Sequence, residues 1–104
     1  MSDSARTAKV KLVTVIVPTE RLDSFSHDLT KLGITGYTSI KADGHGHHGP
    51  RHDGLLDDAN IRFEMLVAPS VAQALLQLVE KTYGDDAVVA FAMNVDVVPY
   101  KNFA

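Results

Sequence analysis

The chain contains no cysteine, which removes several kinds of chemistry at once. Without thiols there is no disulfide framework, no thiolate zinc site and no cysteine nucleophile. A chain of this composition is compatible with a reducing cytosol, so we expect a cytoplasmic protein.

Positive charge and long apolar runs are also scarce. Ten Lys and Arg residues face 13 Asp and Glu residues, which leaves no broad basic surface and predicts no nucleic-acid partner. The first residues, MSDSARTAKVKL, mix charges ahead of a short apolar run and therefore predict neither a signal peptide nor a membrane span. The length of 104 residues fits a single domain over residues 1–104, with a flexible N-terminus of about residues 1–8.

The first part of the chain has the pattern of a strand, a helix and a second strand. Val10–Val17 is a β-branched run that ends at Pro18. Thr19 is a candidate N-cap, and apolar residues then recur at helical spacing until Gly33. The segment GYTSIKA, from Gly36, is rich in strand-forming residues and predicts the second strand.

The same order repeats in the second part of the chain. Ile61–Val67 alternates as a strand does, and Ser70 with Gln73 predicts a capping box at the start of a helix that Gly84 would end. Residues 87–98 supply the last strand. Two strand–helix–strand halves predict an α+β, ferredoxin-like split βαβ fold (βαββαβ) with a four-stranded antiparallel sheet and both helices on one face.

The last strand predicts how the other face of the sheet is used. Almost every residue of VVAFAM is apolar, so both faces of this strand favour burial, yet the helices can cover only one. A symmetric homo-oligomer, such as a ring, would cover the second face. The alternative is a short apolar run that reflects only a small core.

A long segment of about residues 43–59 carries the most informative composition. It holds four of the seven glycines and four of the five histidines, and long loops in compact domains are usually functional or disordered. Its glycine N–H groups and Arg51 could hold a phosphate, or it could be a solvated loop adapted to a partner. A third interpretation is a metal-binding module, because imidazole ligates metals readily. Its ligands would be His45, His47, His48 and His52.

Several short motifs occur in the order found in one known family. The stretch LGITGYTSIKADGHG, the long loop, the segment NIRFE and a final phenylalanine resemble PII signalling proteins, and most of all the SbtB-type and carboxysome-associated PII branch. The resemblance covers about residues 10–103 and implies a homotrimer that binds an adenine nucleotide in each intersubunit cleft. The long segment would then be the T-loop. The residues that would contact the nucleotide are Gly36, Tyr37, Thr38, Gly44, His45, Gly46, Arg51, Arg62, Glu64, Leu66, Val89, Ala90 and Lys101.

Departures from the PII pattern narrow the expected ligand. Residues 84–87, Gly-Asp-Asp-Ala, lack the phosphate-binding lysine of PII proteins, and His48 stands where a second arginine can occur. We therefore expect ADP or AMP rather than ATP, with bicarbonate as a candidate co-ligand near Arg51 and Lys101. The resemblance implies a regulator rather than an enzyme. Its candidate partners are a membrane bicarbonate transporter, which would bring it to the membrane, or a carboxysome-related protein.

Overall fold

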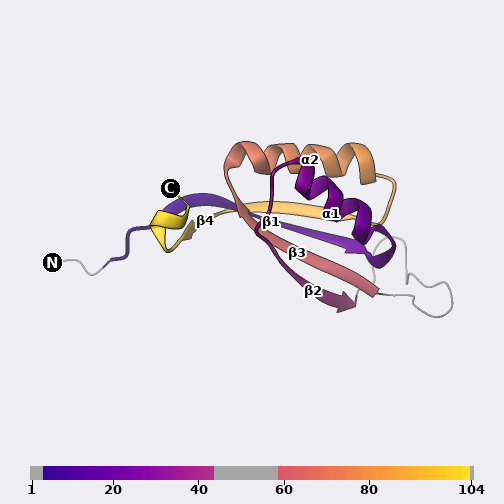
Figure 1. The fold of residues 1–104 in the computed structure, drawn as a ribbon, viewed down its shortest axis with the longest axis horizontal. Coiled ribbons are helices and arrows are strands. Elements are labelled where there is room, and N and C mark those ends of the chain that lie inside the picture. Colours follow the sequence, from indigo (N-terminus) through magenta and orange to yellow (C-terminus); the bar gives the residue numbers. More distant parts are fainter. Residues whose placement is uncertain (1–3, 44–58, 104) are drawn as a thin grey trace.

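The computed structural model describes residues 4–43 and 59–103, and the N- and C-terminal ends of this part lie at the same end of the molecule (Figure 1). The described chain alternates strands and helices in the predicted order. Two short 3-10 turns accompany them, one before the first helix and one after the last strand. The elements are β1 (Ala8–Pro18), η1 (Thr19–Arg21), α1 (Leu22–Lys31), β2 (Thr38–Asp43), β3 (Ala59–Val67), α2 (Pro69–Tyr83), β4 (Val89–Val97) and η2 (Tyr100–Asn102).

The strands form one antiparallel sheet in the order β2-β3-β1-β4. Both helices lie on the same side of it (Figure 1). This arrangement confirms the predicted ferredoxin-like fold. The core lies between sheet and helices and is built from alternate residues of the central strands with the apolar sides of both helices. Its largest fully buried side chains include Val13, Val15, Phe63, Met65, Phe25, Leu29 and Leu75.

The end of α1 follows the sequence prediction closely. Gly33 takes a positive φ of 78°, and its N–H donates to the carbonyl of Thr30 at 3.0 Å. The N–H of Ile34 donates to the carbonyl of Leu29 at 2.9 Å. These two bonds form a Schellman motif, and buried Ile34 and Leu29 both belong to the core. The motif turns the chain sharply from α1 toward β2.

Both predicted helix N-caps are wrong. Thr19 is part of η1, and its hydroxyl donates to the carbonyl of Ala59 at 2.9 Å instead of capping α1. The N-cap of α2 is Ala68, with no side-chain hydrogen bond, and Pro69 follows it in the first turn. Because the helix begins at Pro69, Ser70 is its second residue and cannot act as the N-cap of a capping box.

The second face of the sheet is open in the single chain, as the apolar last strand predicts. Val89, Phe91 and Met93 of β4 keep 56%, 40% and 49% of their surface exposed. Ala90 and Ala92 alternate with them and pack against the core. No helix within residues 4–43 and 59–103 has both the length and the apolar character needed to cross a membrane.

Candidate functional site

A cleft of about 580 Å³ opens where the α1–β2 connection, the end of β3, the start of α2 and the C-terminal residues meet. The turn at Gly33 directs the chain along one wall, and β3 forms another. Most of the lining is apolar, with backbone and a few polar side chains. The lining residues are Leu12, Leu32, Gly33, Ile34, Thr35, Gly36, Tyr37, Thr38, Glu64, Met65, Leu66, Val67, Ala68, Val71 and Phe103.

Strand register brings the two principal polar side chains of the cleft together. Thr38 of β2 lies directly opposite Glu64 of β3, although many residues separate them in the sequence. Opposed residues of an antiparallel pair project to the same face, so the hydroxyl and the carboxylate share the open face of the sheet. A hydroxyl both donates and accepts hydrogen bonds, whereas an ionised carboxylate only accepts. Together they suit a ligand edge that carries N–H or O–H groups.

The carboxylate of Glu64 is held by a neighbour on its own strand. Nη2 of Arg62 lies 2.9 Å from Oε2 of Glu64, and both side chains are partly exposed. An ion pair with this exposure adds little stability, so its clearer effect is to orient Glu64. The Nε of Arg62 is buried and has no hydrogen-bond partner within the described part of the chain.

An aromatic side chain marks the mouth of the cleft. The ring of Tyr37 packs against Phe63, with centroids 5.3 Å apart, and remains 43% exposed. Beside it, a Cβ added at Gly36 would meet no atom within 4 Å, so this wall is open. The cleft therefore combines a rigid aromatic surface, apolar walls and two convergent polar groups, which is the usual character of a small-molecule site.

The structure brings together five of the predicted site residues and leaves others apart. Gly36, Tyr37, Thr38, Glu64 and Leu66 line the cleft. The remaining predicted residues of the described segments lie elsewhere. Arg62 lies beside the cleft on β3, Lys101 is exposed on η2, and Val89 and Ala90 lie on β4.

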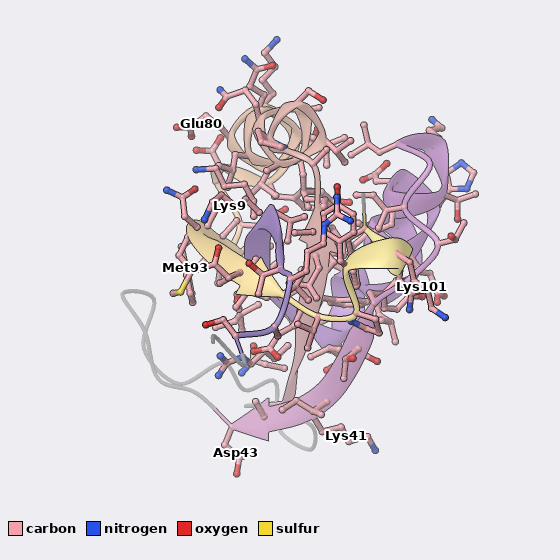
Figure 2. The ribbon with its side chains drawn as sticks, turned by 90° about the vertical axis from the view of Figure 1, so that its left-hand side faces the viewer. Lys9, Lys41, Asp43, Glu80, Met93 and Lys101 are labelled. Carbon is pink, nitrogen blue, oxygen red and sulfur yellow. The ribbon has the colours of Figure 1, made fainter. Side chains whose placement is uncertain are left out.

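The distance of β4 from the cleft follows from the sheet order. β4 and β2 form opposite edges of the sheet, so Val89 and Ala90 cannot share this cleft within one chain. Figure 2 shows Met93 projecting from β4 at the left and Lys41 and Asp43 at the end of β2 below.

The predicted residues of the long segment fall outside the described chain. These are Gly44, His45, Gly46 and Arg51, together with the alternative metal ligands His47, His48 and His52. Within residues 4–43 and 59–103, no three His, Asp or Glu side chains come together as a metal site. The metal-binding interpretation of the histidines stays a prediction.

Sequence reasoning missed one aromatic residue of the cleft. Phe103 lines it, although its place in the chain suggested only a family motif. Leu12 and Val71 were missed as well. Their contribution depends on how β1, α2 and the C-terminal turn pack together, which no local pattern records.

Comparisons with known proteins agree with this fold. The sequence matches the family described as nitrogen regulatory protein P-II over residues 10–100. No curated protein sequence matches the chain.

Solved structures of PII-like proteins have a similar fold. A PII-like signalling protein from Thermus thermophilus is 31% identical, with a TM-score of 0.76 over 94% of this chain and 98% of that chain. CPII from Thiomonas intermedia, bound to ADP and bicarbonate, is 23% identical, with a TM-score of 0.77 over 90% and 93%. CPII bound to ADP, AMP and bicarbonate is 20% identical, with a TM-score of 0.75 over 88% and 96%. The family match and the Thermus relative confirm the resemblance seen in the motifs, and the chain belongs to the P-II family of regulatory proteins.

Proposed function

We propose that this protein is an adenine-nucleotide sensor of the carboxysome-associated PII type. It binds ADP or AMP in clefts between the subunits of a homotrimer, with bicarbonate as a co-ligand. It signals through the segment 43–59 to a partner in inorganic-carbon uptake. The observation that carries the proposal is the cleft in which Thr38 and Glu64 are paired among apolar and aromatic walls.

The chemistry of the cleft suits a purine nucleoside. The flat base would pack among Tyr37, Leu66 and Phe103, while Thr38 and Glu64 would hydrogen-bond the amino group of the base or the ribose hydroxyls. The similar fold of CPII from Thiomonas intermedia, bound to ADP, AMP and bicarbonate, supports the choice of ligand.

The open face of the sheet supports an assembly in which the site spans two subunits. In one chain, Val89 and Ala90 lie at the sheet edge remote from the cleft. Packing open faces together in a ring would bury Phe91 and Met93 and could carry β4 of one copy toward the cleft of the next. The trimer would therefore both cover the apolar face and complete the site.

The charges of the described residues favour a short phosphate chain. No Lys or Arg lines the cleft in the part of the chain that the structure describes. Asp85 and Asp86 occupy the turn after α2. Arg21 of η1 is already paired with this turn, because its Nε lies 3.2 Å from Oδ2 of Asp86. The candidate cations for phosphate or bicarbonate are Lys101 and, in the predicted T-loop, Arg51, which the backbone N–H groups of Gly44–Gly46 would assist. Two cations neutralise AMP or ADP better than ATP.

The proposed output is a switch rather than a reaction. A ligand that binds one arrangement of the T-loop more tightly shifts its population toward that arrangement, and the partner then binds or leaves. The partner would be a bicarbonate transporter or a carboxysome-related protein.

Calorimetric titration with AMP, ADP and ATP, with and without bicarbonate, tests the proposal. We expect binding of AMP and ADP and weaker binding of ATP. Thr38→Val should weaken AMP binding by roughly threefold to tenfold, because it removes about one hydrogen bond. Thr82→Val, at an exposed position on α2, is the matched control and should bind as the wild type does. Absence of heat with every adenine nucleotide would refute the sensor function.

A further inference from the structure

A contact joins the two ends of the described chain, and it involves a residue three positions before the cleft residue Phe103. The guanidinium carbon of Arg6 lies 3.7 Å from the centroid of the Tyr100 ring. The register of β1 and β4 explains why they meet, since Ala8 is opposite Val97, and each residue lies only two or three positions beyond its strand. A guanidinium at this distance over an aromatic face makes a cation–π interaction.

The turn that carries Tyr100 also carries Phe103 into the lining of the cleft. The N–H of Phe103 donates to the carbonyl of Tyr100 at 3.0 Å, and the N–H of Asn102 donates to the carbonyl of Pro99 at 3.1 Å. These bonds join Tyr100 and Phe103 within one turn, so a contact that holds Tyr100 in place also restrains Phe103.

We infer that Arg6 is a positioning residue of the ligand cleft. Its contact with Tyr100 holds η2 in the position in which the Phe103 ring forms an aromatic wall for a planar base. Part of this inference rests on the proposed function, since the planar base is that of the adenine nucleotide. Arg6 itself does not line the cleft, so it acts through Tyr100 and Phe103. The extended residues before β1 thereby take part in ligand binding.

A tryptophan reporter tests, in the absence of ligand, whether Arg6 fixes the position of η2. The chain has no tryptophan, so Phe103→Trp provides a single emission signal within the cleft. Adding Arg6→Gln or Tyr100→Leu should shift this emission to longer wavelength, because the indole leaves the apolar wall. Identical emission with and without Arg6→Gln would overturn the inference.

Nucleotide affinity tests the consequence for binding. Arg6→Gln and Tyr100→Leu should each weaken AMP binding by roughly threefold to fivefold, the range expected for a cation–π contact whose guanidinium is exposed. The conservative changes Arg6→Lys and Tyr100→Phe retain a cation and a ring face, so they should remain within about twofold of the wild type. The double variant Arg6→Gln/Tyr100→Leu should be no weaker than either single variant.

A neighbouring residue supplies the control for loss of charge. Lys9 on β1 pairs with Asp96 on β4 at 2.9 Å, with side chains 84% and 58% exposed. Such a pair contributes little, so Lys9→Gln should leave both the emission and the AMP affinity unchanged. An equal loss in Lys9→Gln would mean that charge alone attracts the nucleotide, and additive losses in the double variant would mean that Arg6 and Tyr100 act independently. Either result would overturn the inference.

The two hypotheses fail in different ways. A wild-type protein that binds no adenine nucleotide refutes the proposed function. The reporter emission then decides whether Arg6 fixes the position of η2. A wild-type protein that binds AMP, with unchanged affinity in Arg6→Gln and Tyr100→Leu, refutes the role of Arg6 and leaves the sensor function standing.

Discussion

At the scale of single residues, Tyr83 makes the main polar connection between the two helices. Its hydroxyl, at the end of α2, donates to Oδ2 of Asp28 on α1 at 2.6 Å and lies 3.1 Å from the hydroxyl of Ser24. Tyr83 is 3% exposed as a residue, and its ring packs edge-on against that of Phe25. Burial, and after it the hydrogen bond to Asp28, raises the pKa of Tyr83 above its ordinary value of 10.0.

Tyr83→Phe should lower the free energy of unfolding by about 1–2 kcal/mol at pH 8, because the bond to a carboxylate is lost while the ring remains. The folded state holds the Tyr83 proton more tightly than the unfolded chain. Its contribution is therefore complete below about pH 10 and is lost as the pH rises through the raised pKa. Urea unfolding at pH 8 and pH 10.5 should show the difference between wild type and Tyr83→Phe shrinking at the higher pH.

The control for this titration is another tyrosine. Tyr37→Phe removes a hydroxyl from a half-exposed ring and should keep the wild-type loss of stability above pH 10. A difference between wild type and Tyr83→Phe that stays constant from pH 8 to pH 10.5 would contradict the proposed role of the Tyr83–Asp28 bond.

At the scale of elements, the regular parts of the fold and the end of α1 at Gly33 were predictable, and the helix N-caps were not. The spacing of apolar residues along the sequence identifies β1, β3 and both helices. Each of these elements buries one face, and burial of one face requires apolar residues at a regular spacing. Thr19 and Ser70 have good capping side chains, but Ser70 lies inside α2, which begins at Pro69. The Thr19 hydroxyl donates instead to the carbonyl of Ala59. That carbonyl is remote in sequence, so no local pattern reveals it.

Prediction of the site residues from sequence has the same limit as prediction of the N-caps. Thr38 and Glu64 were predicted through a family motif, and the register of β2 and β3 explains why the motif works. Phe103 and Arg6 act where the two ends of the described chain meet, beyond any strand or helix period. Side chains placed by periodic elements can be predicted from sequence, whereas those placed by tertiary contacts of irregular segments require the structure.

The turn after α1 gives a test at this scale. Gly33→Ala forces a residue with a Cβ into a φ of 78°, although the Cβ would meet no atom within 4 Å. The cost is therefore backbone strain alone, about 1–2 kcal/mol. Urea unfolding should show this loss for Gly33→Ala and nearly none for Gly36→Ala, a control with equal space and no positive φ. Equal stability of the two variants would exclude the Schellman turn as a source of stability.

At the scale of the whole molecule, the open sheet face is organised in rows that cross all four strands. One row runs Thr38, Glu64, Thr14 and Phe91, since each residue lies opposite the next in the register. Thr38 and Glu64 line the cleft, Thr14 is buried between them and the far strand, and Phe91 lies exposed on β4. The same face therefore carries both the ligand groups and the surface proposed for assembly.

Phe91→Asp separates assembly from folding. Phe91 is 40% exposed in the single chain, so a carboxylate there can stay hydrated in a monomer, but it would be buried without a partner in the proposed trimer. Sedimentation equilibrium should give a trimer for the wild type and smaller species for Phe91→Asp, with helical circular dichroism retained and AMP binding weakened. Gln77→Asp adds the same charge at an exposed position of α2 and should remain trimeric. A Phe91→Asp protein that still forms the trimer would show that subunits do not meet through this face, and the cleft would then have to bind its ligand without β4 of a neighbouring copy.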